Sequence, residues 1–186
     1  IYKENRTRDD SVLDWSALFA FSNKLVEDFK NNLPFKVIQV KSAEADDIIG
    51  VLCRHIDKEF VIVSSDKDYK QCITSDGRVS MWDPLKKAYI KCNDPRRFVI
   101  ESALMGQNKD NILNVLTPLT WNKEESRRPP FGPKKAAKII DEIGLDKWLD
   151  KEGVRERFNQ NMQVMDLSQT PEIIKDRILD LYKNQF

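Results

Sequence analysis

The stretch FKVIQVKSAEADDIIGVLCRHIDKEFVIV at residues 35–63 decides the fold class. FKVIQV is a short β-branched run that predicts a strand over 35–40. EADDIIGVLCRHI has the apolar spacing of an amphipathic helix over 44–56. The continuous apolar run FVIV predicts a second strand over 60–63, covered on both faces. This alternation of strand and helix predicts an α/β fold, with a partly parallel central sheet and flanking helices.

The segments on either side extend this pattern. Apolar residues recur at helical spacing over 14–32, and Leu33-Pro34 ends the helix predicted there. Residues 79–91 predict a β-hairpin around Asp83-Pro84. Pro95 suits a first helical position, so another helix is predicted over 95–105.

The composition changes after this point. Residues 117–131 are rich in proline and predict a loop. From Gly132 onward the sequence predicts helices only, over 133–143, 145–150, 153–164 and 171–184. We therefore expect two domains, an α/β core over residues 1–110 and a helical region over residues 111–186.

Composition excludes several classes of protein. The 186 residues carry 31 basic and 30 acidic side chains, for a net charge of +1. This balance argues against a nucleic-acid-binding protein that is basic overall, but it allows local basic patches. Three cysteines and one histidine argue against a disulfide framework and against zinc held by histidines, and they predict a cytoplasmic protein. No apolar run approaches the roughly 20 residues of a membrane span. Because the first residue is Ile1, we expect the chain to begin inside a longer protein.

Three acidic clusters are candidate chemical sites. Glu44, Asp46 and Asp47 stand in the first turn of a predicted helix, where carboxylates also complement the helix dipole. Asp66 and Asp68 follow the strand at 60–63, where ligands bind in open α/β sheets, although Ser65 or Asp66 could simply cap a helix. Asp110 follows Gly106, and taken alone it is better explained by an ordinary turn.

Taken together, these clusters predict a metal site. Carboxylates are natural ligands of Mg²⁺ or Mn²⁺. Two such ions held ~3.5–4 Å apart are a standard device for phosphodiester hydrolysis. The clusters therefore favour a metal-dependent enzyme that acts on nucleic acid.

A local basic patch surrounds the start of the helix predicted at Pro133. Its first-turn amides and lysines could bind backbone phosphates, and the alternative is a solvated helix end. The candidate DNA-binding residues are Arg127, Arg128, Gly132, Lys134, Lys135 and Lys138.

Five motifs in order resemble the 5′-nuclease (flap endonuclease) family. They are Tyr2-Lys3-Glu4-Asn5-Arg6, E-A-D-D-I-I from Glu44, S-S-D-K-D-Y from Ser64, G-x-x-x-D-N-I from Gly106 and G-P-K-K-A-A-K-I from Gly132. The long insert between Asn111 and Gly132, and the Trp82-x-Pro84 hairpin, are most similar to the ribonuclease H branch of T-even-type phages.

The resemblance implies a fold, an activity and a set of site residues. The family has a PIN-like nuclease core and removes RNA primers and 5′ flaps by a two-metal mechanism, working 5′ to 3′ during DNA replication. Lys3 and Arg6 would then face the scissile phosphate, and the region from Gly132 to Lys138 would belong to a helix–three-turn–helix that grips duplex DNA. The implied metal ligands are Glu44, Asp46, Asp47, Asp66, Asp68 and, beside the second ion, Asp110.

The resemblance also implies the partners. The expected substrates are branched or nicked duplex DNA and RNA–DNA hybrids with a 5′ end. A single-strand-binding protein or a sliding clamp would be a protein partner, and no membrane is expected. If the protein is phage-encoded, the expected compartment is the host cytoplasm.

Three departures from the family pattern keep alternatives open. Gln107 stands where the family has Asp, which should weaken the second ion, and Pro130-Phe131-Gly132 replaces a GxG loop. The family's first strand and its two early aspartates would precede residue 1. A non-catalytic relative that binds branched DNA is therefore one alternative. A receiver-like phosphoacceptor module is another, but the basic helical half argues against it.

Overall fold

The computed structural model describes residues 13–118, 121 and 128–185. These residues form two compact units. Unit 1 runs from Asp57 to Gln169, and unit 2 combines the segment that ends at Ile56 with the segment from Thr170 onward. The domain boundary predicted after residue 110 falls within unit 1 and stays a prediction. Within the described ranges, no helix has the length and apolar character needed to cross a membrane.

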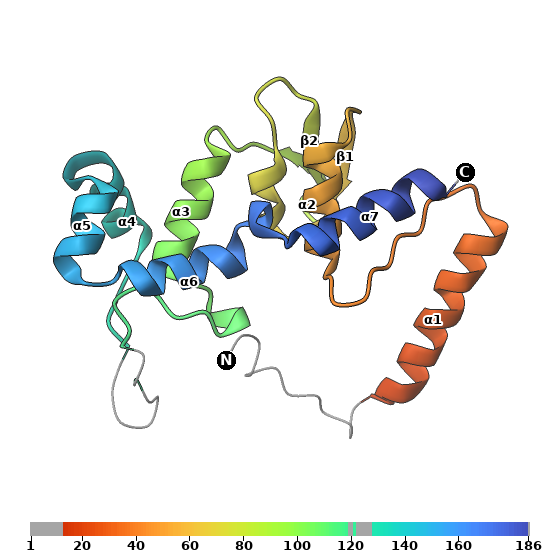
Figure 1. Ribbon diagram of the computed structural model, residues 1–186, viewed down its shortest axis with the longest axis horizontal. Coiled ribbons are helices and arrows are strands. Elements are labelled where there is room, and N and C mark those ends of the chain that lie inside the picture. The colour runs from red at the N-terminus through yellow and green to blue at the C-terminus, as the bar shows by residue number, and fades with distance from the viewer. Residues whose placement is uncertain (1–12, 119–120, 122–127, 186) are drawn as a thin grey trace. The chain divides into compact units, whose positions relative to one another are not determined.

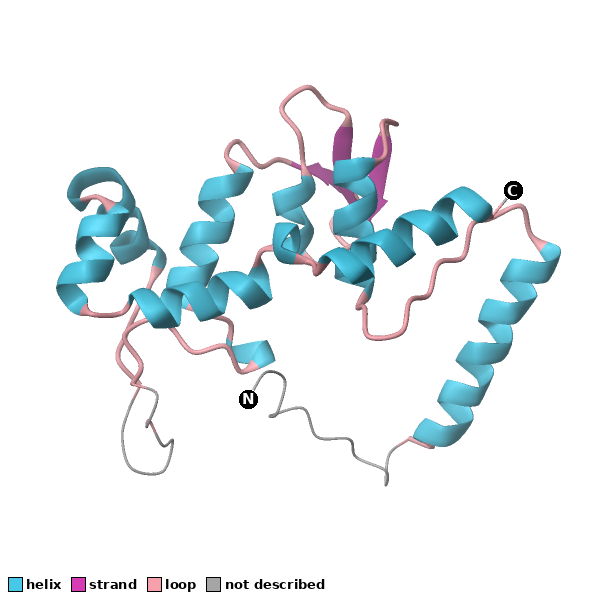
Figure 2. Ribbon diagram, viewed as in Figure 1, coloured by secondary structure: helices cyan, strands magenta, loops and turns pink. Residues whose placement is uncertain are grey.

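A three-stranded sheet organises unit 1 (Figures 1 and 2). Its strands are β1 (Phe60–Val63), β2 (Val79–Asp83) and β3 (Ala88–Ile90), in the order β1-β2-β3. β1 and β2 are parallel, and β2 and β3 form the predicted antiparallel hairpin. The predicted partly parallel sheet with flanking helices is thus confirmed.

The two faces of β1 differ from the prediction. Ile62 is buried, whereas Val61 and Val63 are 56% and 66% exposed. The expectation that FVIV is covered on both faces is therefore wrong. A continuous apolar run indicates a strand, but the burial of each face depends on which other elements pack against it.

The helices of unit 1 follow the predicted boundaries closely. The helix predicted over 95–105 is α3 (Pro95–Met105), which Asp94 caps by accepting a hydrogen bond from the Arg97 amide at 2.8 Å. The helix predicted over 133–143 is α4 (Pro133–Lys138) followed by a π-helical turn, η3 (Ile139–Ile143). The remaining helical segments are η1 (Lys67–Cys72), η2 (Asn108–Asp110), α5 (Leu145–Glu152), α6 (Arg155–Met165) and η4 (Leu167–Gln169).

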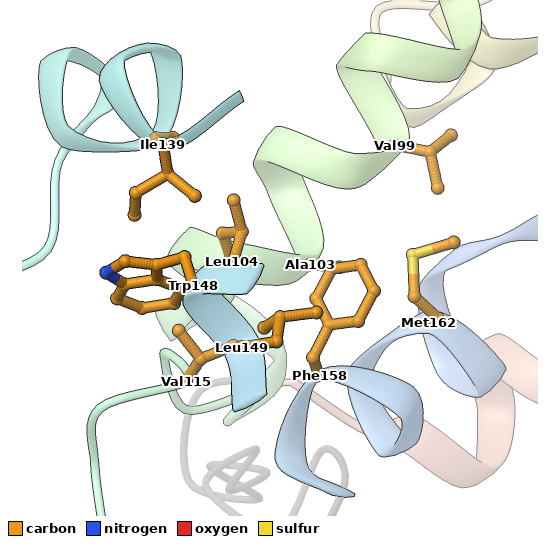
Figure 3. Packing of buried hydrophobic residues seen from close by; sticks show 10 residues of the cluster. Val99, Ala103, Leu104, Val115, Ile139, Trp148, Leu149, Phe158 and Met162 are labelled. Carbon is orange, nitrogen blue, oxygen red and sulfur yellow. The ribbon is translucent and has the colours of Figure 1, made fainter. Parts of the chain in front are cut away.

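The hydrophobic core of unit 1 joins α3 to the later helices (Figure 3). Leu104 and Leu149 are fully buried and Ile139 is 1% exposed. Burying each such side chain stabilises the fold by roughly 1.5–3 kcal/mol. Buried Asn161 on α6 adds two hydrogen bonds to this core. Its Nδ2 donates to the carbonyl oxygens of Ala103 at 2.8 Å and Leu113 at 2.9 Å. The core therefore fixes the end of α3 and the loop that follows it.

Unit 2 contains α1 (Trp15–Asn32), α2 (Ala45–His55) and α7 (Glu172–Asn184). α2 and α7 share a small core of buried residues, which are Val40, Val51, Ile174 and Ile178. All three helices appear where the sequence predicts them. α1 has no buried residue, so its apolar periodicity predicts the helix correctly but not its packing.

The strand predicted over 35–40 is wrong, because this segment has no regular secondary structure. Val37 instead bonds to the side chain of Gln185. Its amide donates to Gln185 Oε1 at 2.9 Å and its carbonyl oxygen accepts from Gln185 Nε2 at 3.0 Å. A side-chain amide thus replaces the neighbouring strand that the β-branched run predicts. Composition gives β propensity, but a strand also needs a partner.

Candidate functional site

Asp66 and Asp68 lie in the loop directly after β1. Asp66 is the N-cap of η1, and its Oδ1 accepts a hydrogen bond from the Asp68 amide at 3.1 Å. The Asp66 amide in turn donates to Ser64 Oγ at 3.0 Å. The capping role considered for Asp66 is therefore confirmed. It leaves Asp66 Oδ2 and the Asp68 carboxylate to contact other groups.

Buried Asp83, at the end of β2, fixes this loop. Its Oδ1 accepts from Ser65 Oγ at 2.6 Å and from the Leu85 amide at 3.0 Å, and its Oδ2 pairs with Lys86 Nζ at 3.0 Å. The hydrogen bond from Ser65 and the contact with Lys86 hold the pKa of Asp83 far below its usual range. The sequence pattern indicates Asp83 only as a turn residue, and no local signal points to its contact with the acidic loop.

A tight loop after α3 brings the third acidic cluster to the same place. Gly106 has φ +68°, and a Cβ there would lie 2.4 Å from the carbonyl oxygen of Ile112. Only glycine fits such a position. Gln107 and Ile112 then exchange two backbone hydrogen bonds, of 2.8 and 2.9 Å. This bridge closes the loop that carries Lys109 and Asp110.

Lys109 joins the acidic side chains of the two loops. Its Nζ lies 3.2 Å from Asp66 Oδ2, 3.5 Å from Asp68 Oδ2 and 3.8 Å from Asp110 Oδ2. Gln107 adds a second contact, because its Nε2 donates to Asp68 Oδ1 at 2.8 Å. We call these five residues the Lys109 cluster. The structure thus brings Asp66, Asp68 and Asp110 together, as the metal-site prediction requires, but around an ammonium group.

The charges of this cluster are mutually adjusted. Burial alone would raise the pKa of Asp66, but the Asp68 amide and Lys109 together lower it below its ordinary value. Burial raises the pKa of Asp68 despite the hydrogen bond from Gln107. Burial alone would lower the pKa of Lys109, but the neighbouring carboxylates raise it above its ordinary value, and Asp68 makes the largest contribution among them. Lys109 is therefore a charged ammonium at neutral pH and compensates the carboxylates.

The other three predicted ligands begin α2, in unit 2. Glu44 and Asp47 form a capping box, in which Asp47 Oδ2 accepts from the Glu44 amide at 2.9 Å. Asp47 Oδ1 accepts from the hydroxyl of Thr170 at 3.2 Å. Asp46 is half-buried in the same turn. The helix-terminus role is thus confirmed for Glu44 and Asp47, and their role as metal ligands stays a prediction.

The donor set fits a divalent ion in kind but not in arrangement. Carboxylate oxygens are what Mg²⁺ and Mn²⁺ prefer. Within the part of the chain that the structure describes, however, no group of three or more acidic, histidine or cysteine side chains is arranged to hold an ion. In the Lys109 cluster an ammonium and an amide N–H already occupy carboxylate oxygens.

The predicted DNA-binding residues lie at and before α4. Gly132 is its N-cap, and Lys134, Lys135 and Lys138 are exposed on it. Arg128 stacks over Trp121, with its guanidinium carbon 5.1 Å from the ring centroid, and donates to Asn108 Oδ1. Lys3, Arg6 and Arg127 lie outside the described residues.

The sequence itself matches a known family over residues 1–102, described as the 5′-3′ exonuclease N-terminal resolvase-like domain. Since the match covers more than half of the chain, the chain belongs to this 5′-3′ exonuclease family. The resemblance drawn from the motifs is thereby confirmed.

Individual relatives agree with this assignment. The chain is 28% identical over 196 residues to ribonuclease H of Enterobacteria phage T4, covering 98% of this chain and 63% of that relative. It thus spans less than two thirds of the length of the curated relative that it matches.

Solved structures show the same fold. The chain superposes on T5 5′-exonuclease with bound zinc at a TM-score of 0.72, with 19% identity, over 100% of this chain and 77% of that one. It superposes on bacteriophage T5 flap endonuclease, in a pseudo-enzyme–product complex with DNA and metal ions, at a TM-score of 0.71. That match has 18% identity and covers 99% of this chain and 76% of the other.

Proposed function

We propose that the complete protein is a divalent-metal-dependent 5′→3′ exonuclease or flap endonuclease. It hydrolyses phosphodiester bonds of RNA primers or 5′ flaps at duplex junctions during DNA replication. The observation that carries the proposal is the convergence of Asp66, Asp68 and Asp110 beyond the carboxyl end of β1 in a chain of the 5′-3′ exonuclease family. The expected substrates are branched or nicked duplex DNA and RNA–DNA hybrids with a 5′ end.

The residues of the chain divide the work between cation binding and substrate binding. Glu44 and Asp46, at the start of α2, would hold a divalent ion, Mg²⁺ or Mn²⁺. Such an ion supplies a hydroxide from bound water and stabilises the charge that develops on phosphate oxygens. In unit 1, Asp66 and Asp68 hold the Lys109 ammonium, and we propose that they act on the substrate through this bound positive charge. Lys3 and Arg6 would face the scissile phosphate, as the family resemblance implies.

The basic residues around α4 would bind the duplex backbone. Lys134 and Lys135 are exposed in its first turn, and Arg128 precedes it. Cations that contact phosphates fix the register of a protein on DNA and carry no sequence information. This arrangement suits an enzyme that recognises a junction by its shape. A single-strand-binding protein or a sliding clamp would assist it on replicating DNA.

One specific observation favours a second candidate, a non-catalytic relative that binds branched DNA. Gln107 contributes an N–H donor where the family pattern has a carboxylate, and Lys109 already neutralises the neighbouring aspartates. Both features compensate the negative charge of the cluster, so a metal ion is less needed to stabilise its carboxylates. This candidate predicts junction binding without cleavage.

A cleavage assay separates the two candidates. The product of the complete reading frame is incubated with a 5′-flap duplex and an RNA–DNA hybrid, each labelled at the 3′ end, in Mg²⁺, in Mn²⁺ or in EDTA. The nuclease predicts shortened products with either metal and none in EDTA. Tight binding of the flap with no product in any metal would instead support the non-catalytic relative.

A further inference from the structure

The Lys109 cluster brings three carboxylates within 3.8 Å of one ammonium. Asp110 is 7% exposed at its side chain and Asp68 is 20% exposed, so these charges lie partly away from water. Buried carboxylates so close together repel one another unless a cation lies among them. A metal ion or a basic side chain meets this need, and here the chain itself provides the cation.

Gln107 completes the compensation. The carboxylate of Asp68 receives the Gln107 Nε2–H at 2.8 Å on Oδ1 and the ammonium of Lys109 at 3.5 Å on Oδ2. An amide N–H can satisfy a carboxylate oxygen but cannot coordinate a cation. Gln107 is itself 7% exposed and is held by the backbone bridge to Ile112, so it keeps this position. Both oxygens of Asp68 are thus engaged without a metal.

We propose that Lys109 is a built-in cation that takes the place of the second divalent ion in this nuclease. The carboxylates of Asp66, Asp68 and Asp110 hold its ammonium, and Gln107 fixes Asp68 in the matching orientation. The inference rests on the proposed function only for the expectation of a second ion. Because the Lys109 side chain is 48% exposed, its charge still faces solvent, where a phosphate oxygen can approach it.

Counting bound Mn²⁺ tests this proposal without any cleavage. The 186-residue chain is titrated with Mn²⁺, and free Mn²⁺ is followed by electron paramagnetic resonance. Three variants are compared with the parent: Lys109→Met, the double variant Gln107→Asp/Lys109→Met, and Lys67→Ala. Lys67 is the matched control, since it is an exposed lysine between Asp66 and Asp68 in the same loop. Circular dichroism checks that each variant is folded.

The proposal predicts a gain of metal binding in a definite order. Lys109→Met should increase the affinity of the weakest Mn²⁺ site at least about tenfold. The reason is that the repulsion between an ammonium and a metal ion about 4 Å apart near a protein surface exceeds the free energy of a tenfold change in affinity. The double variant should bind one more Mn²⁺ per chain than the parent. Lys67→Ala should leave the number of bound ions unchanged and should change the affinity much less than Lys109→Met does, because Lys67 is exposed and makes none of the ion pairs of the Lys109 cluster.

Two results would overturn the proposal. One is a parent chain that binds as many Mn²⁺ ions as the double variant with equal affinity. The other is a gain in Lys67→Ala equal to that in Lys109→Met, which would reduce the effect to local net charge. If the double variant does not fold, the single variant Lys109→Met decides by the same affinity criterion. A protein that fails to cleave DNA leaves these counts unchanged, so failure of the proposed function is recognised separately.

Discussion

Gly106→Ala is the substitution that most sharply tests how the fold positions the Lys109 cluster. Gly106 has φ +68° and ψ −177°, a region that is essentially restricted to glycine. Placing alanine there costs about 1–3 kcal/mol in backbone strain alone. The new Cβ would also lie 2.4 Å from the Ile112 carbonyl oxygen and 2.7 Å from the Asn114 amide nitrogen. Both of these neighbours are backbone atoms, so no side chain can turn aside.

Relief of this clash must move the 112–114 backbone away from α3. That movement breaks the two hydrogen bonds between Gln107 and Ile112, each worth about 0.5–1.5 kcal/mol. We therefore expect Gly106→Ala to lower the free energy of unfolding by about 4 kcal/mol, a large share of the ~5–15 kcal/mol of a typical domain. The movement would also separate Lys109 from Asp66 and Asp68.

Urea unfolding measures this loss, and Gly153→Ala is the matched control. Gly153 has φ +67°, but a Cβ there would meet nothing within 4 Å. Its replacement should cost only the left-handed backbone penalty of about 1–2 kcal/mol. If the two variants differed by less than about 1 kcal/mol, the close approach at Gly106 would not be a real constraint on the loop.

Two further predictions concern duplex binding by the lysines of α4 and the ion pair of Asp166 after α6. Replacing Lys134 and Lys135 with Ala should reduce the slope of log binding constant against log salt concentration for duplex DNA by about 1–2, while binding of single strands stays unchanged. If a salt titration gave the parental slope, both lysines would be solvated and would not contact phosphates. Asp166 is buried and pairs with Arg96 at 2.5 Å. The substitution Asp166→Asn should therefore lower the free energy of unfolding at pH 7 by about 1–3 kcal/mol. Burial alone would raise the pKa of Asp166, but hydrogen bonds from Ser168 and Arg96 lower it below 3.8, so its contribution is present above about pH 4 and is lost as the pH falls through the lowered pKa. Parent and Asp166→Asn should therefore converge in stability in thermal melts as the pH falls through the lowered pKa of Asp166. A stability difference that stayed constant down to the most acidic pH at which both proteins fold would contradict this assignment.

Helix boundaries were predictable because the local sequence encodes them. The helix at 95–105 begins at Pro95, after a capping Asp94, and ends at Met105, before Gly106; the structure has the same limits. These signals act through the backbone within one turn, so they do not depend on the rest of the fold. The strand predicted over 35–40 failed for the opposite reason. Its β-branched residues indicate a preference for extended backbone, but Gln185, far along the chain, determines what that backbone bonds to.

The candidate site was predictable as a convergence but not as a charge arrangement. Asp66 and Asp68 follow a strand, where ligands bind in open α/β sheets, and the ordered motifs of the family placed Asp110 beside them. The role of Lys109 depends on contacts with a loop about forty residues earlier, and no local pattern distinguishes it from a solvated lysine. A lysine next to a carboxylate that is expected to bind metal was the one available signal. The support of the loop by Asp83 through Ser65 is likewise a long-range contact.

The cleavage and binding of a 5′-flap duplex by Asp68→Asn test the central claim most directly. In the complete protein with Mg²⁺, this variant should lose about 10–100-fold in cleavage rate, because we propose that the Asp68 carboxylate helps to hold a cation of the active site. Its affinity for the same flap, measured in Ca²⁺ without turnover, should stay within about threefold of the parent, since phosphate contacts elsewhere hold the substrate. Cleavage at a near-parental rate would contradict the assignment of this acidic loop to the active site of a 5′ nuclease.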